Sequence, residues 1–258
     1  MTGSIITILA PRGGSGKTLL ACNLAVVLSA GGDRTVCLVD LDIDSGDVAG
    51  SFGLPSPATV TPSASPDGHL VAAMLPELLT PYAPGLDCVL APTMPGESQK
   101  VVAAFVEELL TALQARYDFV VIDTPTRMSS LVQAAIDVSD HHVIVTTPQF
   151  PAMRSLRRTL DILDLLGTRN TRRTIVLNHA DAVGGLSETQ VSRFVRAKVA
   201  GRIPTSRDAF SSINAHTPLA VSDPQHAVVD AISDFAKAHL MPTYDTSLIP
   251  SARPANPI

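Results

Sequence analysis

Three glycines, a lysine and a threonine lie within one short segment near the start of the chain. Gly13, Gly14 and Gly16 precede Lys17 and Thr18 in the run PRGGSGKT. Glycines let main-chain N–H groups turn toward a bound anion and approach it closely. A lysine ammonium and a threonine hydroxyl at this spacing suit the β- and γ-phosphates and the Mg²⁺ ion of a nucleoside triphosphate. The segment therefore predicts a triphosphate-binding loop.

This loop departs at one position from the common phosphate-loop pattern G-x-x-x-x-G-K-[ST]. Pro11 stands where that pattern has a glycine. The alternative interpretation is a glycine-rich turn that carries a solvated lysine. A strand pattern before the loop and a helix pattern after it favour the phosphate site, because the helix N-terminus adds partial positive charge.

Carboxylates follow two other apolar runs. Asp40, Asp42, Asp44 and Asp47 lie within LVDLDIDSGD, and Asp123 ends the run YDFVVID. Carboxylates crowded in this way repel one another unless a cation or water network shares their charge. An aspartate at the end of a buried strand is also where P-loop enzymes hold their metal-associated acid. Each cluster alone is compatible with an acidic turn, but together with the glycine-rich loop they predict one metal–nucleotide site.

Six short apolar runs must position these loops. They are typical of parallel strands buried on both faces, and they cover residues 4–10, 35–41, 86–91, 119–123, 142–146 and 174–178. Helix patterns alternate with them at 18–30, 70–79, 98–115, 129–138, 152–166, 187–196 and 225–240, with a short helix after Ser206. The alternation predicts an α/β fold, a single doubly wound, mostly parallel sheet with helices on both faces. In such a fold the carboxyl ends of the strands line one crevice.

Length and composition limit the class of protein. The 258 residues, 45% hydrophobic and 17% charged, are enough for a sizeable core and exclude a disordered chain. We expect one domain over 1–241, with a loop rich in Pro and Ser at 55–69, and a flexible Pro-rich tail at 242–258. No apolar run is long enough to span a membrane, and no secretory signal is expected. Three cysteines without a C-x-x-C pair favour reduced core thiols in a cytoplasmic protein.

The motifs resemble those of the MinD/ParA family of P-loop ATPases, which have a deviant Walker A loop. PRGGSGKT resembles the family pattern K-G-G-x-G-K-[ST], LVDLDIDSGD its first switch region, and YDFVVIDTP its Walker B strand. VLNHADA around Asn178 resembles the segment whose asparagine reads adenine, and 203–221 resembles a late family segment. The likeness covers about residues 1–240. LVDLDIDSGDVAGSFGL and GLDCVLAPTMPGE are most similar to the CpaE/TadZ branch, which helps to localise a Tad/Flp-type pilus or secretion apparatus.

The resemblance implies a positional switch that binds ATP and Mg²⁺, forms a homodimer with ATP, and hydrolyses ATP slowly. The residues implied in nucleotide binding are Arg12, Gly13, Gly14, Ser15, Gly16, Lys17, Thr18, Leu19 and Asn178. Lys17, Asp42 and Arg12 are the implied catalytic residues, with Asp42 positioning the attacking water. The implied metal residues are Thr18, Asp40 and Asp123, with Thr18 binding Mg²⁺, Asp123 a metal-bound water and Asp40 supporting the metal shell.

Three features depart from the family pattern. Arg12 replaces the signature lysine that reaches across the dimer; an arginine keeps the charge and resembles an arginine finger, while the alternative is a solvated loop arginine. Leu19 replaces a frequent second hydroxyl, and Thr126 and Arg127 stand where the second switch often has a glycine. A scaffold that binds nucleotide with little hydrolysis therefore remains an alternative.

The charge of the chain is unevenly distributed. Residues 1–153 carry 6 basic and 15 acidic side chains, residues 154–207 carry 11 and 4, and residues 208–258 carry 2 and 5. The middle block is therefore the candidate for an electrostatic partner surface. The final block has no lysine beyond Met241 and several prolines, so we expect no direct membrane anchor there. A partner would recruit the protein to a membrane or pole.

Three arginines of the middle block share one face of a predicted helix. Arg154, Arg157 and Arg158 are spaced i, i+3 and i+4. Some ParA-type proteins hold DNA nonspecifically through basic residues, an attraction that falls with salt. The alternative is a solvated helix face. The rival function is therefore a ParA/MinD-type ATPase for DNA partition or for positioning cell division.

Overall fold

The computed structural model describes residues 2–55, 67–92, 98, 101–168, 171–195 and 198–241. Most of the loop expected at 55–69 and the whole tail expected at 242–258 lie outside the described residues.

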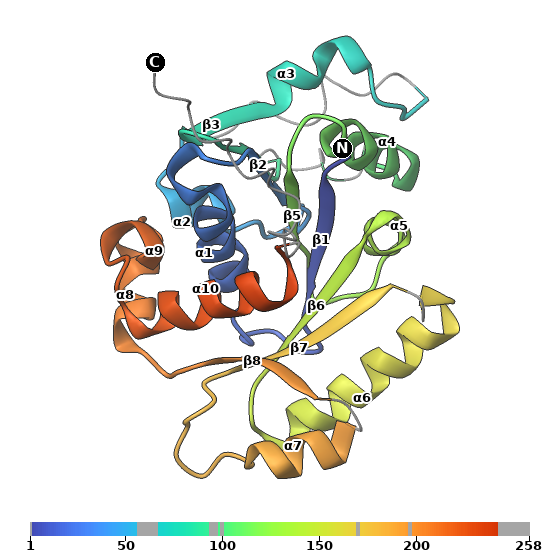
Figure 1. The fold of residues 1–258 in the computed structure, drawn as a ribbon. Coiled ribbons are helices and arrows are strands. Elements are labelled where there is room, and N and C mark those ends of the chain that lie inside the picture. Colours follow the sequence, from blue (N-terminus) through green and yellow to red (C-terminus); the bar gives the residue numbers. More distant parts are fainter. Residues whose placement is uncertain are drawn as a thin grey trace, which may run out of the picture.

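Within the described residues, eight strands form one sheet. Their bounds are β1 Ser4–Leu9, β2 Val36–Asp40, β3 Leu79–Ala83, β4 Leu86–Val89, β5 Phe119–Asp123, β6 His141–Thr146, β7 Arg172–Asn178 and β8 Val199–Ile203. The strand order is β3-β4-β2-β5-β1-β6-β7-β8 (Figure 1). All neighbours pair in parallel except β3, which is antiparallel to β4. The predicted doubly wound, mostly parallel sheet is confirmed.

Helices cover both faces of this sheet. Their bounds are α1 Lys17–Ser29, α2 Val48–Phe52, α3 Leu75–Leu78, α4 Ala103–Gln114, α5 Ser130–Val138, α6 Phe150–Leu165, α7 Glu188–Val195, α8 Arg207–Asn214, α9 Leu219–Ser222 and α10 Ala227–His239, with short 3₁₀ turns at Ala30–Gly32 and Ala72–Met74. Figure 1 shows α1, α2, α8, α9 and α10 on one side and α4 to α7 on the other. In the part of the chain with described placement, no helix has both the length and the apolar character of a membrane span.

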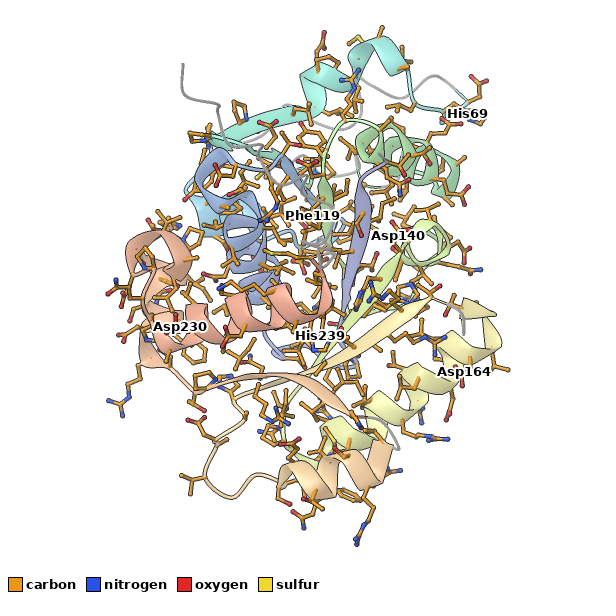
Figure 2. The ribbon with its side chains drawn as sticks, in the orientation of Figure 1. His69, Phe119, Asp140, Asp164, Asp230 and His239 are labelled. Carbon is orange, nitrogen blue, oxygen red and sulfur yellow. The ribbon has the colours of Figure 1, made fainter. Side chains whose placement is uncertain are left out.

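The apolar core lies on both faces of the sheet, which explains the continuous apolar runs. In β1, Ile6 and Ile8 pack toward α1 and α10, whereas Ile5 and Leu9 belong to the clusters on the opposite face. Side chains fill both spaces between the sheet and the helices (Figure 2), and the labelled Phe119 joins the core on the α1 side. Because both faces of such a strand are buried, its residues are apolar throughout and do not alternate with polar ones.

Two strands were not predicted, and one predicted helix was wrong. The helix expected at 70–79 is a 3₁₀ turn followed by the four-residue α3, and the chain then enters β3. Both missed strands, β3 and β8, lie at the edges of the sheet. Their burial alternates, as expected at an edge where one face is solvated. In β8, Gly201 allows close packing, since a Cβ there would lie 3.0 Å from the ring of Phe235.

Candidate functional site

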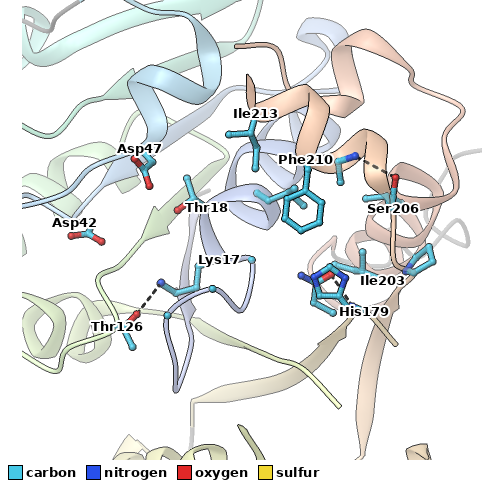
Figure 3. Close-up of a pocket in the computed structure, with 18 residues that line it drawn as sticks. Lys17, Thr18, Asp42, Asp47, Thr126, His179, Ile203, Ser206, Phe210 and Ile213 are labelled. Atoms are coloured by element: carbon cyan, nitrogen blue, oxygen red, sulfur yellow. Dashed lines mark hydrogen bonds between the residues drawn. The ribbon is translucent and has the colours of Figure 1, made fainter. Parts of the chain in front are cut away.

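A cavity of about 380 Å³ opens at the carboxyl ends of the strands (Figure 3). The loops after β1, β2, β5, β7 and β8, together with α8 and the start of α10, contribute its walls. Its lining residues are Gly13, Gly14, Gly16, Lys17, Thr18, Leu19, Asp42, Asp47, Thr126, Asn178, His179, Ile203, Pro204, Ser206, Ala209, Phe210, Ile213 and Val228. The crevice expected from the alternating pattern is therefore present.

The glycine-rich loop forms one end of the cavity. Gly14 and Gly16 have φ values of 73° and 89°, a left-handed conformation that side chains disfavour. Helix α1 begins at Lys17, so its unpaired first N–H groups lie at this loop. Ser15 is buried, and its hydroxyl donates a 2.9 Å hydrogen bond to the carbonyl of Arg12. This end therefore combines N–H groups, a helix N-terminus and a lysine, the features that bind phosphate.

The two charged side chains of this loop have different surroundings. Lys17 Nζ donates a 3.4 Å hydrogen bond to Thr126 Oγ1 in the loop after β5 (Figure 3). Thr126, noted in the sequence only as a departure from the family pattern, therefore contacts the phosphate-loop lysine. Arg12 is exposed, and no described residue holds its guanidinium. Its side chain is thus available to a group outside the subunit.

Thr18 and Asp123 are in direct contact where the start of α1 meets the end of β5. The Thr18 hydroxyl donates a 2.6 Å hydrogen bond to Asp123 Oδ2. Asp123 Oδ1 is buried and has no hydrogen-bond partner among the described residues. Buried polar atoms in folded proteins usually have a partner, and a bound cation would satisfy this oxygen. A hydroxyl next to a carboxylate is the type of oxygen pair that Mg²⁺ prefers, so these residues fit the predicted ion.

Asp40 lies beside Asp123 because the two occupy one register position of β2 and β5. Its carboxylate accepts the N–H groups of Asp42 and Val48, each at 3.1 Å. Asp40 therefore shapes the loop that carries Asp42 into the cavity. In the described ranges, no cluster of three or more His, Cys, Asp or Glu could hold a metal alone. Mg²⁺ usually takes one or two protein carboxylates and completes its shell with phosphate and water.

Two carboxyl groups of the site, those of Asp40 and Asp123, are buried. Burial raises the pKa of Asp123 to about 6, against the lowering effects of the Thr18 hydrogen bond and of Lys17. Burial and the neighbouring Asp123 raise the pKa of Asp40 well above its ordinary value. Burial also raises the pKa of Asp42, while Lys17 lowers it. A cation at this position would relieve the shared repulsion.

The opposite end of the cavity is aromatic and apolar. The rings of His179 and Phe210 are stacked, with centroids 6.1 Å apart and planes 10° from parallel. Ile203 and Ile213 lie beside them, and Phe210 is 59% exposed. An open aromatic face next to apolar side chains suits the flat ring of a base.

Asn178 lies between the two ends. Its Nδ2 donates a 3.0 Å hydrogen bond to the carbonyl of Ser15, and its Oδ1 accepts the N–H of His179 at 3.0 Å. Each of these side-chain atoms retains one further hydrogen-bonding position. Asn178, which the sequence predicts to bind the nucleotide, thus lies in the cavity wall and contacts the phosphate loop.

The structure brings most of the predicted site residues to the cavity wall. The four that do not line the cavity are Arg12, Ser15, Asp40 and Asp123. The prediction missed Asp47, which lines the cavity from the loop after β2, and it missed His179 and Phe210. Asp47 was visible as a member of the acidic run, whereas the stacked pair joins segments that no sequence motif connects.

The arginines proposed for DNA binding lie on α6 and do not line the cavity. Arg154 and Arg158 are exposed. Arg157 Nε is 3.2 Å from Asp161 Oδ1, an ion pair of the i,i+4 type. Two of the three charges therefore remain available to an external anion.

Comparisons with known proteins agree with this geometry. The family model described as CobQ/CobB/MinD/ParA nucleotide-binding domain matches residues 6–219. The septum site-determining protein MinD of Thermotoga maritima is 23% identical over 85% of this chain and 82% of its own length. A ParA-family ATPase of Chlorobium tepidum shares the fold with a TM-score of 0.84 and 21% identity, covering 93% of this chain and 99% of that one. MinD of Pyrococcus horikoshii, solved with Mg-ADP, gives a TM-score of 0.79 at 18% identity, covering 92% and 95%. The chain therefore belongs to the CobQ/CobB/MinD/ParA nucleotide-binding domain family.

Proposed function

We propose that this protein binds ATP with Mg²⁺ in the cavity, hydrolyses it slowly and uses the nucleotide as a positional switch. The observation that carries the proposal is the convergence of Lys17 with the Thr18–Asp123 pair at the start of α1. A cationic loop and an aromatic end in the cavity wall, with Thr18 of that wall hydrogen-bonded to the Asp123 carboxylate, match the three parts of a magnesium nucleotide.

Each part of the site has a separate role in this proposal. The N–H groups of residues 13–18 and the Lys17 ammonium hold the phosphates. Thr18 and Asp123 hold Mg²⁺ directly or through water, and Asp40 supports the loop around them. Bound Mg²⁺ would neutralise negative charge on the transferring phosphate. Asp42 faces the cavity and orients the attacking water.

The switch requires a second subunit. Arg12 is exposed on the phosphate loop, no described residue pairs with its guanidinium, and it is the residue we assign to the partner's nucleotide. An arginine that contacts the transferring phosphate stabilises its negative charge. ATP would thus favour the homodimer, and hydrolysis would release it.

Calorimetry and steady-state turnover test this function. The full chain should bind Mg-ATP and release phosphate above background. Lys17→Ala should abolish turnover, and Asp42→Ala should reduce turnover while retaining most binding. A flat calorimetric titration with Mg-ATP would contradict the proposal. Binding without turnover in the wild type would instead support the nucleotide-dependent scaffold.

For the cellular task, we propose the localisation of a Tad/Flp-type pilus or secretion apparatus. The support is the similarity of LVDLDIDSGDVAGSFGL and GLDCVLAPTMPGE to the CpaE/TadZ branch. We propose residues 1–241 as the ATPase domain and 242–258 as a tail. The three described cysteines are free and buried, which agrees with a cytoplasmic location, and a partner would recruit the protein to a membrane or pole. Purified pilus-assembly proteins should bind the ATP form in preference to the ADP form.

DNA partition or cell-division positioning is the second candidate function. The curated relatives include septum site-determining MinD proteins and a ParA-family protein, and Arg154 and Arg158 are exposed on α6. This function predicts ATP-dependent binding to arbitrary duplex DNA that weakens with salt. The triple change Arg154→Glu, Arg157→Glu and Arg158→Glu should abolish it. No binding at low salt would eliminate DNA partition.

A further inference from the structure

The side chain of Asn178 contacts the phosphate loop directly. It is 5% exposed, and its Nδ2 donates a 3.0 Å hydrogen bond to the Ser15 carbonyl. Its Oδ1 is held by the N–H of His179, so the amide plane is fixed from both sides. The contact joins the end of β7 to a loop 163 residues away in the sequence. A buried amide fixed in this way provides a rigid support for the loop.

This hydrogen bond determines the direction of one peptide group of the loop. The C=O and N–H of a trans peptide point in opposite directions. Because the Ser15 carbonyl points at Asn178, the Gly16 N–H points away from Asn178. The Arg12 carbonyl is occupied in the same way by the Ser15 hydroxyl. Two carbonyl oxygens that would repel a phosphate are thus bound to donors within the protein.

Gly16 fits this arrangement because it has no side chain. Its φ of 89° favours glycine, and a Cβ built there would collide with Asn178 Nδ2. The asparagine amide therefore occupies the space that a side chain at position 16 would need. The close approach lets Asn178 act on the loop without an intervening group.

We propose that Asn178 is a positioning residue for the phosphate loop, whose Nδ2–H holds the Ser15–Gly16 peptide in its anion-binding orientation. This inference rests on the proposed nucleotide site. The inference predicts different ligand dependence at the two ends of the cavity. Asn178 would support the binding of every triphosphate, whereas Phe210 would act only on ligands that carry a base. Reading of adenine by the remaining positions of the amide is a separate contribution.

Calorimetric titrations with Mg-ATP and with inorganic tripolyphosphate plus Mg²⁺ distinguish these contributions. Asn178→Ala should weaken tripolyphosphate about fivefold to tenfold, the effect of one lost hydrogen bond, and should weaken Mg-ATP by at least the same factor. Phe210→Ala is the matched comparison and should weaken Mg-ATP while leaving tripolyphosphate unchanged. A loss confined to Mg-ATP in Asn178→Ala, or no loss for either ligand, would overturn the inference.

Hydrogen–deuterium exchange of the nucleotide-free protein provides a readout that needs no ligand. Amides of residues 13–18 should exchange faster in Asn178→Ala than in the wild type, and Phe210→Ala should not change them. Unchanged loop exchange in Asn178→Ala would overturn the inference. If Asn178→Ala does not fold, Asn178→Asp keeps the size and the acceptor for the His179 N–H but lacks the donor, and it should show the same faster exchange. A wild type that binds neither ligand would refute the proposed function, while the exchange measurement would still decide the role of Asn178.

Discussion

The hydroxyl of Thr18 and the carboxylate of Asp123 are joined by a 2.6 Å hydrogen bond between residues 105 positions apart in the sequence. One residue belongs to the first turn of α1 and the other to the end of β5. The pair brings the phosphate loop and the second acidic segment into direct contact. Both side chains supply hard oxygen ligands, and Asp123 Oδ1 remains buried without a partner among the described residues.

Thr18→Val should impair magnesium-dependent binding while keeping the shape of the side chain. We expect the affinity for Mg-ATP to fall about 10- to 100-fold. Loss of a group that only hydrogen-bonds to a metal ligand typically has this effect, and loss of a ligand oxygen should have at least as large an effect. In EDTA, which removes Mg²⁺, the affinity of the variant for ATP should fall much less. Thr18→Ser retains the hydroxyl and should bind nearly as the wild type does. Equal losses with and without Mg²⁺ would contradict a metal role for Thr18.

Arg12 should act on the nucleotide of the partner subunit. Arg12→Ala and Lys17→Ala subunits should each be inactive alone, since one lacks the arginine and the other cannot hold the phosphates. In a mixed dimer, the intact phosphate loop of the Arg12→Ala subunit faces the intact Arg12 of the other subunit. Mixing should therefore restore part of the phosphate release measured in a coupled assay. No recovery in a mixture proven to contain heterodimers would favour a solvated loop arginine.

Gly46, in the first acidic segment, and Gly50, in α2, should respond in opposite ways to alanine. A Cβ at Gly46 would collide with the side chain of Ala91 and lie 2.5 Å from Asp40 Oδ2, whereas a Cβ at Gly50 meets nothing within 4 Å. Gly46→Ala should lower the free energy of unfolding by about 1–3 kcal/mol, the usual cost of overpacking. Gly50→Ala, in α2, should be neutral or stabilising by up to about 1 kcal/mol. Urea denaturation measures both, and equal effects would contradict the close packing around Gly46.

His141 should make the protein less stable in mild acid. Burial, with the nearby charge of Arg172, lowers the pKa of His141 from 6.5 to about 4. Between these pH values the unfolded chain binds a proton that the folded protein excludes, so the free energy of unfolding falls as the pH falls. The full effect is up to about 3 kcal/mol.

The raised pKa of Asp123 acts in the opposite direction, because the folded protein then holds a proton that the unfolded chain has released. The His141 effect must therefore be measured as a difference between variants. Urea denaturation from pH 7 to pH 4.5 should show a steeper loss for the wild type than for His141→Gln. Parallel pH profiles would contradict a neutral buried His141.

The central strands could be predicted from sequence because burial on both faces makes them apolar throughout. Four of the six predicted runs cover β1, β2, β4 and β5 fully, and the other two start one residue into β6 and two residues into β7. The edge strands could not be found in the same way. Pro81 interrupts β3, and Gly201 and Arg202 weaken the apolar pattern of β8. Their pairing depends on a neighbour already in place, which no local pattern reveals.

The phosphate end of the site was predictable because its residues are contiguous. Gly16, Lys17 and Thr18 carry a strand–loop–helix signal with a defined chemistry. The aromatic end depends on His179 and Phe210, which meet only because the loop after β7 packs against α8. The hydrogen bond from Lys17 to Thr126 has the same origin, since it joins the end of the loop after β1 to the loop after β5. Contacts of this kind follow from the strand order and not from a motif.

The outermost strand β3 has a consequence for self-association. Pro81 pairs with Asp87 of β4, and the register shifts between Pro81 and Ala83. A proline in an edge strand offers no donor to an incoming chain, and a bulge twists the edge out of line. This border is consequently a poor template for strand-to-strand growth into fibrils. Copies of the chain that meet at another surface can therefore come together without their sheets merging along that side.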